Sequence, residues 1–350
     1  MQNRVQAFVK LGQFLSQFSQ NGITKNDSVE FNELFFDGFK HQLKIAEENN
    51  AWFTKDNIMF ALQSWSNALT KENINSWLKD APINANSKTV AIIMAGNIPL
   101  VGFHDFLSVL ISGYSVLVKQ SSNDKHLLPF LAKYLEYVDP TLKGNIEFTE
   151  EKLENYDAVI ATGSDNTARY FEYYFKDKPS IIRKNRNSVA VLTGNESEIE
   201  LESLSNDIFQ YFGLGCRSVS KLFVPKGYNF DLFFKGMYNK HKIINNAKYA
   251  NNYDYNKAVY LMSEFDLLEN GFIMIKEDES YASPIATVFY EYYTDLDELK
   301  SKVLNDSEKI QCVVSSSNIF DNEISFGNTQ NPQLWDYADG INTLDFLAKI

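Results

Sequence analysis

The chain has 350 residues, of which 44% are apolar and 22% are charged, and its formal net charge is −12. This length allows two domains with cores of their own, and the composition is ordinary for a globular protein. Acidic residues outnumber basic ones by 45 to 33 and no basic block occurs, which argues against a nucleic-acid-binding surface. No apolar run approaches the roughly 20 residues that cross a bilayer, so no transmembrane segment is expected.

The first 80 residues are expected to be helical. Apolar residues recur at helical spacing within 8–18, 31–49 and 58–69. Polar residues interrupt every apolar pair near the N-terminus, which is not the pattern of a signal peptide. With two cysteines and no such signal, we expect free thiols and a cytoplasmic protein.

Short β-branched runs alternate with helical stretches from residue 81 onward, which predicts an α/β architecture with a largely parallel sheet. The strand-like runs are 89–94, 114–119, 157–161 and 187–193, and the helical stretches between them are 100–112, 125–138 and 167–175. A second alternating set follows residue 216. The expected organisation is an N-terminal helical segment over 1–80, a first α/β domain over 81–192 against which 325–350 pack, and a second over 193–324.

Two strand ends in the first α/β domain carry polar residues that could bind a ligand. Asn97, in "MAGNIPLVGF", is placed to project its amide from a strand end, although an asparagine there also suits the cap of the following helix. Lys119 ends a strand and is followed by Ser121 and Ser122. Ligands bind at the carboxyl ends of strands in open α/β sheets, so this set suits a ribose or its phosphate; a solvated lysine explains it equally well.

A third strand end, in "YDAVIATGSDNTARYFEYY", runs through a turn with Gly163 and Ser164 into a helix. Backbone N–H groups at such a helix start bind phosphate, and a glycine lets the phosphate approach closely. The G-x-G-x-x-G fingerprint of dinucleotide-binding proteins is absent, and a plain strand-to-helix turn explains the same pattern.

Cys216 lies in "YFGLGCRSVS", on a Gly-x-Gly turn before an apolar run. A nucleophile belongs where glycines let backbone and substrate approach, whereas a core cysteine belongs inside an apolar run, as Cys312 does in "IQCVVSS". Arg217 is placed either to lower the pKa of the thiol or to form a salt bridge in solvent. His104 and Asp105 are adjacent on a predicted helix and point in different directions, so we interpret them as structural.

In their order along the chain, these segments resemble the aldehyde dehydrogenase superfamily. Within it the chain is most similar to the LuxC-type acyl-CoA reductases, the fatty-acid reductases of bacterial luminescence systems. The resemblance covers roughly residues 85–345 and rests on MAGNIPL, VLVKQSSND, FGLGCRSVSKLFVP and the C-terminal LWDYADGINTL. It implies an aldehyde-dehydrogenase-like fold, in which a Rossmann-like cofactor domain is followed by an α/β catalytic domain.

The resemblance also implies a role for each candidate residue. Cys216 is then the nucleophile that forms an acyl-thioester, and the oxyanion is held by the Asn97 side chain and the Cys216 N–H. The residues that bind the cofactor are then Lys119, Ser121, Ser122, Gly163 and Ser164. No metal is expected.

The implied activity is NADPH-dependent reduction of a long-chain fatty acyl-CoA, or another activated acyl group, to the aldehyde. An acyl-phosphate reductase of the same fold stays open as an alternative, although Arg217 alone is thin support for its carboxylate site. A catalytically silent assembly partner is the other alternative. We further expect a homo-oligomer and an acyl-activating enzyme as partner.

Two departures from the superfamily pattern sharpen this expectation. NAD-preferring relatives usually place a glutamate where this chain has Ser122, whose hydroxyl can donate a hydrogen bond to the 2′-phosphate of NADPH. Oxidising relatives place a general base where this chain has Ile182, and the nearest carboxylates are those of Asp177 and Glu196. Without a base within hydrogen-bond reach of water, the acyl-enzyme is expected to hydrolyse slowly, which suits a reductase.

Overall fold

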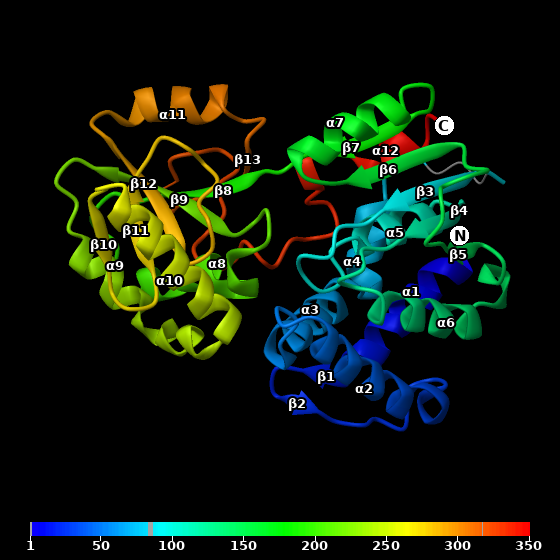
Figure 1. Ribbon diagram of the computed structural model, residues 1–350. Helices are drawn as coiled ribbons and strands as arrows, with labels where there is room; N and C mark the ends of the chain where they lie inside the picture. Colours follow the sequence, from blue (N-terminus) through cyan, green and yellow to red (C-terminus); the bar gives the residue numbers. More distant parts are fainter. Residues whose placement is uncertain (1, 83–86, 317) are drawn as a thin grey trace. The chain divides into compact units, whose positions relative to one another are not determined.

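The computed structural model describes residues 2–82, 87–316 and 318–350, and the chain divides into two compact units (Figure 1). The first unit is Met1–Lys184 together with Gln333–Ile350, and the second is Asn185–Pro332. Each unit is an α/β structure built on a mainly parallel sheet, as the alternation of strands and helices predicts.

Helices open the first unit, as the periodicity of residues 1–80 predicts. They are α1 (Gln2–Leu15), α2 (Asn32–Asn49), α3 (Lys55–Ala68) and α4 (Lys71–Leu78). A short hairpin of β1 (Phe18–Ser19) and β2 (Gly22–Ile23) joins α1 to α2 and was not expected. Thr54 and Thr70 cap α3 and α4, each accepting a hydrogen bond from the backbone N–H three residues on.

The sheet of the first unit has five parallel strands in the order β5-β4-β3-β6-β7. They are β3 (Thr89–Ile93), β4 (Ser115–Lys119), β5 (Ile146–Phe148), β6 (Ala158–Thr162) and β7 (Ser180–Arg183). The connections contain α5 (Phe103–Ile111), α6 (Leu127–Val138), the short 3-10 helix η1 (Pro140–Leu142) and α7 (Asp165–Tyr174). Because both faces are covered, the central strands are continuous apolar runs.

The N-terminal helices share one hydrophobic core with α5, α6 and one face of this sheet. Phe14 of α1 stacks on Tyr134 of α6 with ring centroids 4.5 Å apart, and Phe8 packs edge-on against Phe103 of α5. The opposite face of the sheet is covered by α7 through Phe171 and Phe175. The sheet therefore sits between two layers of helices.

The last residues of the chain pack into the first unit, as expected for 325–350, but only from Gln333 onward (red in Figure 1). This tail contains η4 (Ala338–Gly340) and α12 (Thr343–Leu347). The Trp77 indole donates to the Tyr337 hydroxyl at 2.7 Å, and the Tyr114 hydroxyl donates to the Leu347 carbonyl at 2.5 Å. The tail thus fills part of the core rather than lying on the surface.

The second unit has a six-stranded sheet in the order β10-β11-β12-β9-β8-β13, in which only β10 runs antiparallel to its neighbour. The strands are β8 (Asn187–Val191), β9 (Val219–Pro225), β10 (Leu267–Glu269), β11 (Met274–Glu277), β12 (Thr287–Tyr293) and β13 (Ile310–Val314). The helices are α8 (Glu198–Phe209), α9 (Phe230–Met237), α10 (Ala247–Met262) and α11 (Leu296–Asn305), with the 3-10 helices η2 (Gln210–Gly213) and η3 (Tyr238–Asn245).

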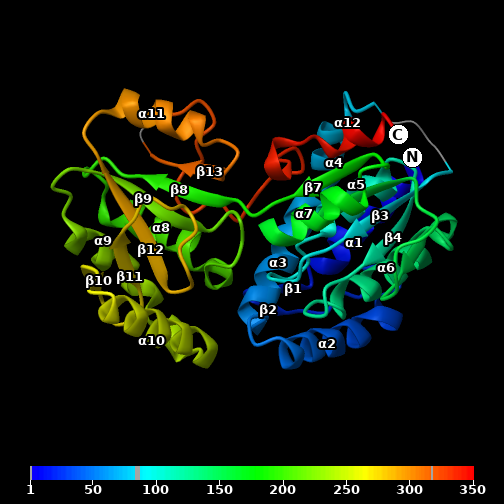
Figure 2. The ribbon, with the colours of Figure 1, turned by 45° about the horizontal axis from the view of Figure 1, so that its top comes forward.

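Helices cover both faces of this second sheet (Figure 2). On one face, Leu299 and Val303 of α11 pack on Val189, Val191 and Phe223. On the other face lie α8, α9 and α10, and a capping box formed by Ser197 and Glu200 fixes the start of α8.

One boundary differs from the sequence-based expectation. The run 187–193 was expected to belong to the first domain, which was placed over 81–192, but β8 pairs with β9 and β13 in the second unit. The periodicity of a strand shows that it is a strand and leaves open which sheet it joins, because the hydrogen-bond partners are distant in sequence.

Candidate functional site

The candidate residues of the first unit follow three neighbouring strands. Asn97 follows β3, Lys119 ends β4, and Gly163 follows β6. The sheet order places β3 between β4 and β6, and all three are parallel. Their carboxyl ends therefore meet at one edge, and the structure brings Asn97, the Lys119 segment and the Gly163 turn together there.

The turn that carries Asn97 packs directly on the neighbouring strand end. The Met94 N–H donates to the Lys119 carbonyl at 3.0 Å, which extends the pairing of β3 with β4. A Cβ at Gly96 would lie 2.6 Å from both Cβ and Oγ of Ser121, so only glycine fits this contact. The half-buried Asn97 is thus held beside the Ser121 segment.

Asn97 does not cap the helix that follows it. Helix α5 begins at Phe103, and its N-cap position is Gly102, with no capping side-chain hydrogen bond. Of the two interpretations of Asn97 from the sequence, the helix cap is therefore wrong. The interpretation as a polar side chain at a strand end remains.

Asp124 supports this turn and was not found by sequence reasoning. Its side chain is buried, and Oδ2 accepts a hydrogen bond from the Leu100 N–H at 2.9 Å, at a residue whose φ is 58°. Burial raises the pKa of Asp124 to about 6, and the bond from Leu100 opposes that rise. The only signal in the sequence was the polar run Gln120–Asp124, which reads as an exposed loop.

Lys119 and the two serines form the polar end of β4. The Lys119 ammonium donates to the Glu151 carbonyl at 2.9 Å, and an ammonium has two further hydrogens to offer. Ser121 is half-buried and its Oγ accepts from the Asn123 N–H at 3.3 Å, while Ser122 is exposed. This is a cation with nearby hydroxyls at a strand end, a donor set that fits a ribose phosphate.

Gly163 and Ser164 form the turn into α7. Ser164 is the N-cap, and its hydroxyl accepts from the Thr167 N–H at 3.3 Å. A Cβ at Gly163 would come within 3.0 Å of Thr167 and Phe171, so the absence of a side chain lets the strand end approach the helix. The start of a ten-residue helix favours an anion, although Asp165 in its first turn opposes one.

Cys216 belongs to the second unit and lies just before β9. Tyr211, Phe212 and Gly213 have φ values of 55°, 59° and 77°, so the chain leaves α8 through a left-handed run of three residues. Two of them carry large side chains, and non-glycine residues in this region cost of order 1–3 kcal/mol each. Such strain persists only where surrounding contacts impose it, and it is concentrated at functional sites.

The turn is tied to the sheet around the cysteine itself. The Ser188 hydroxyl at the start of β8 donates to the Cys216 carbonyl at 3.0 Å, and the Ser218 N–H donates to the Gly215 carbonyl at 2.9 Å. The Cys216 residue is exposed and forms no disulfide. Cys312 is buried in β13, which confirms its assignment to the core.

Arg217 donates to the Thr329 carbonyl at 3.3 Å within the second unit. It therefore has a backbone partner that neither of its two interpretations anticipated. His104 and Asp105 have separate partners in the first unit: the His104 ring lies 2.8 Å from the Leu334 carbonyl, and Asp105 forms a buried ion pair with Arg183 at 2.7 Å.

A small cavity of about 30 Å³ borders the cysteine turn. It has room for roughly two water-sized groups. Residues on both sides of Cys216 line it, and its walls combine apolar side chains with those of Ser220, Ser283 and Thr287. The lining includes Ile208, Phe209, Phe212, Gly213, Val219, Tyr249, Ile273, Ile285 and Val288.

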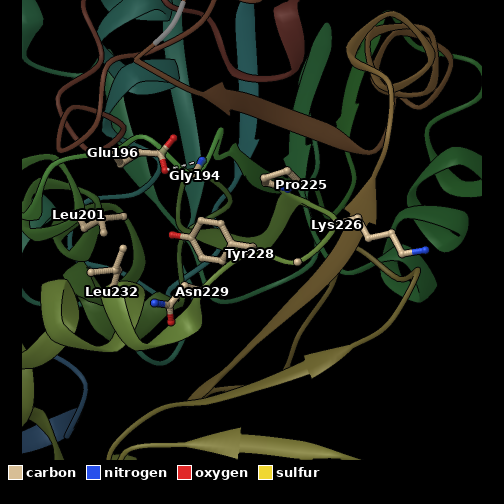
Figure 3. Close-up of a pocket in the computed structure, with 9 residues that line it drawn as sticks. Gly194, Glu196, Leu201, Pro225, Lys226, Tyr228, Asn229 and Leu232 are labelled. Carbon is tan, nitrogen blue, oxygen red and sulfur yellow. Dashed lines mark hydrogen bonds between the residues drawn. The ribbon is translucent and has the colours of Figure 1, made fainter.

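A larger cavity, of about 220 Å³, lies beyond the carboxyl ends of β8 and β9 in the second unit (Figure 3). It is lined by Glu196, which follows β8, and by Pro225, Lys226 and Tyr228, which end or follow β9. The Glu196 carboxylate accepts hydrogen bonds from the Thr193 and Gly194 N–H groups. Because β9 spans seven residues, roughly 20 Å separate these strand ends from Cys216, so Glu196 does not serve Cys216 as a base.

Neither a membrane span nor a metal site is found among the residues that the structure describes. None of the helices there combines the length and the apolar character needed to cross a membrane. Likewise, among the residues that the structure describes, His, Cys, Asp and Glu side chains form no group of three suited to a metal ion.

Solved structures similar to this chain are aldehyde dehydrogenases. Aldehyde dehydrogenase 21 from Physcomitrella patens, solved with the product succinate, matches 91% of this chain and 74% of its own, with a TM-score of 0.64 and 12% identity. The aldehyde dehydrogenase KauB from Pseudomonas aeruginosa matches 90% of this chain and 72% of its own, with a TM-score of 0.64 and 13% identity. An indole-3-acetaldehyde dehydrogenase in complex with NAD+ matches 90% and 72%, with a TM-score of 0.63 and 12% identity.

These likenesses confirm the predicted aldehyde-dehydrogenase-like fold. A family model described as acyl-CoA reductase (LuxC) matches residues 40–233, more than half of the chain. A comparison with curated protein sequences gives no match.

Proposed function

The chain belongs to the LuxC family of acyl-CoA reductases, and from this premise we propose that it reduces a long-chain acyl-CoA to the aldehyde with NADPH, through a thioester on Cys216. One observation carries the proposal: an exposed cysteine follows a strained left-handed run at the amino end of β9. Strain of this kind, next to a chemically reactive side chain, is typical of functional sites.

The proposed reaction begins when the Cys216 thiolate attacks the thioester carbonyl. A bond forms between the sulfur and the acyl carbon, and coenzyme A leaves as its thiol. The bound nicotinamide supplies the hydride that, with one proton, reduces the acyl-thioester to a hemithioacetal. This collapses to the aldehyde and the free Cys216 thiol, so that one acyl-CoA, one NADPH and one proton give aldehyde, coenzyme A and NADP+.

The chain's own residues stabilise the charge and bind the cofactor in this proposal. The Cys216 N–H is one donor to the oxyanion, and Asn97 has the role of the second donor through the family resemblance. The donor set at the edge of the first sheet fits a dinucleotide. The proposed cofactor residues are Lys119, Ser121, Ser122, Gly163 and Ser164.

The acyl group and the partners are part of the proposal too. In this proposal the acyl chain contacts the apolar side chains in the mixed lining of the cavity beside the cysteine turn. Because the cavity volume is about 30 Å³, a long chain must displace side chains such as Phe212. We also propose a cytoplasmic homo-oligomer that receives its substrate from an acyl-activating enzyme, on the family resemblance.

The deciding experiment follows NADPH oxidation with acyl-CoAs of graded length. Aldehyde must form in a one-to-one ratio with NADP+, and the rate must be highest for long acyl chains. An acyl phosphate that is reduced while every acyl-CoA is inert would replace the proposed substrate with the alternative one. No reduction of any activated acyl group would favour a silent assembly partner.

A further inference from the structure

Asp207 is a charged side chain with no exposed surface, near the end of α8 and four residues before the left-handed run. Both of its carboxylate oxygens accept hydrogen bonds from one loop. Oδ2 accepts from the Gly327 N–H at 2.6 Å, and Oδ1 accepts from the Thr329 N–H and the Thr329 hydroxyl, both at 2.9 Å. A buried carboxylate is tolerated only with such partners, so the loop and the carboxylate require each other.

The loop that Asp207 fixes also holds the residues beside Cys216. The Thr329 carbonyl accepts from the Arg217 guanidinium at 3.3 Å, and the Gln330 amide donates to the Ser218 hydroxyl at 3.3 Å. Thr329 and Ser218 are buried, so these contacts are shielded from water. A continuous set of hydrogen bonds therefore runs from Asp207 through the loop to both residues that follow the cysteine.

We infer that Asp207 is a positioning residue: by fixing residues 327–330 it sets the place of Arg217 and Ser218 and so of the Cys216 sulfur. The inference rests on the proposed role of Cys216. Asp207 touches no reacting atom and acts through the loop. Ser188 bonds the backbone of the cysteine turn, and the loop that Asp207 fixes bonds the side chains of the two residues that follow the cysteine.

A merely structural role for Asp207 is the competing explanation, and Glu196 provides a matched control. Glu196 lies in the same unit and accepts three hydrogen bonds, from the Thr193 N–H, the Thr193 hydroxyl and the Gly194 N–H. It follows the carboxyl end of β8, whereas Cys216 precedes the amino end of β9. Both Asp207→Asn and Glu196→Gln remove a charged acceptor, and only the first affects the loop beside the cysteine.

The test measures alkylation of Cys216 by iodoacetamide, with the modified peptide quantified by mass spectrometry, beside kcat and KM for acyl-CoA reduction. We expect Asp207→Asn to change the alkylation rate more than threefold and to lower kcat at least tenfold with KM within twofold. Glu196→Gln should leave the alkylation rate, kcat and KM within twofold of wild type. An alkylation rate within threefold of wild type in Asp207→Asn, with only the melting temperature lowered, overturns the inference.

If Asp207→Asn does not fold, the variants of Thr329 decide. Thr329→Val removes one of the three hydrogen bonds, whereas Thr329→Ser keeps the hydroxyl. The alkylation rate must change more than threefold in the valine variant and stay within threefold in the serine variant; equal rates in both overturn the inference. Alkylation is measured without substrate, so its result does not depend on the reductase activity. If Cys216→Ala still reduces acyl-CoA, the proposed function fails, and this failure is distinguishable from a failure of the inference about Asp207.

Discussion

The candidate residues of the two units lie at opposite ends of the strands of their sheets. In the first unit, Asn97, Lys119 and Gly163 follow the carboxyl ends of parallel strands, where loops are free to present polar groups. In the second unit, Cys216 precedes its strand and follows a run of three residues with positive φ values. The topology of a sheet thus brings the candidate residues of the first unit together, whereas the cysteine follows a locally strained run of backbone.

The two regions also differ in what holds them. At the strand ends of the first unit, neighbouring turns pack on one another, as Gly96 does on Ser121. Around Cys216, the Ser188 hydroxyl bonds the backbone of the turn, and the loop at Thr329 and Gln330 bonds the side chains of Arg217 and Ser218. The following predictions test whether this difference corresponds to a difference in chemistry.

The largest effect is expected at the cysteines. Cys216→Ala should lower acyl-CoA reduction by at least about a thousandfold, because no other side chain can form the acyl-thioester. Incubation with labelled acyl-CoA, without cofactor, should mark the wild type and leave this variant unlabelled. Cys312→Ala is the matched control and should keep its label; label that persists on Cys216→Ala would place the nucleophile elsewhere.

Asn97→Ala tests the candidate residues at the carboxyl ends of the first unit's strands. The loss of one oxyanion donor typically lowers kcat by about 10²–10³-fold, and we expect that loss here with an unchanged KM for NADPH. Acylation and reduction should be measured separately in single-turnover experiments. A kcat within threefold of wild type would mean that Asn97 serves only the packing of its turn.

Asp124 gives the first unit a pH-dependent stability. Because its pKa is raised in the folded state, the folded chain retains a proton that the unfolded chain loses, and this contribution is present below pH 4 and lost as the pH rises through about 6. We expect the unfolding free energy of the wild type, relative to Asp124→Asn, to fall by about 2–3 kcal/mol between pH 4 and 7.5. Urea unfolding across this range checks it; parallel curves for the two proteins would show that Asp124 does not titrate there.

The rate of acyl-enzyme hydrolysis tests the prediction that no general base activates water at Cys216. The family resemblance aligns Ile182 with the glutamate of oxidising relatives, and Glu196 follows the carboxyl end of β8, away from Cys216. In the absence of cofactor, we expect release of free acid at least tenfold more slowly than NADPH-driven aldehyde formation. Comparable rates would reveal a working base, and loss of hydrolysis in Asp177→Asn would identify it.

The smallest expected effect concerns the choice of cofactor. The wild type should prefer NADPH, because the exposed Ser122 hydroxyl can donate a hydrogen bond to the 2′-phosphate and Lys119 adds positive charge. Ser122→Glu should shift the ratio of kcat/KM values about tenfold toward NADH, or about 1.4 kcal/mol. A tenfold advantage for NADH in the wild type would contradict the assignment, and Ser164→Ala should leave the ratio unchanged.

Much of the fold followed from patterns in the sequence. Strands such as β3, β4 and β6 are short β-branched runs between amphipathic stretches, so their positions and parallel arrangement were predictable. The membership of β8 in the second sheet was not, because its partners β9 and β13 begin more than 30 and 120 residues after it. The hairpin of β1 and β2 was also missed, since two-residue strands leave no periodicity.

The residues of the candidate site likewise divide into those that the sequence could predict and those that it could not. Gly163, Lys119 and Cys216 stand next to recognisable turns and strand ends, so local sequence drew attention to them. Asp124 and Asp207 act through burial and through distant backbone partners, and a carboxylate in a polar run or within a helix looks like any exposed residue. The partner of Arg217 was likewise invisible, because Thr329 lies 112 residues away.

The return of the tail to the first unit determines the order in which this chain can fold during its synthesis. Domains fold as units while the chain emerges, yet the first unit here needs Tyr337 for Trp77, Ala338 for Arg183 and Leu347 for Tyr114. Those residues are made only after the whole second unit. The segment that contains the Cys216 turn is therefore synthesised in full before the first unit is complete. Until residues 333–350 are made, the first 184 residues lack the part of their core that this tail supplies.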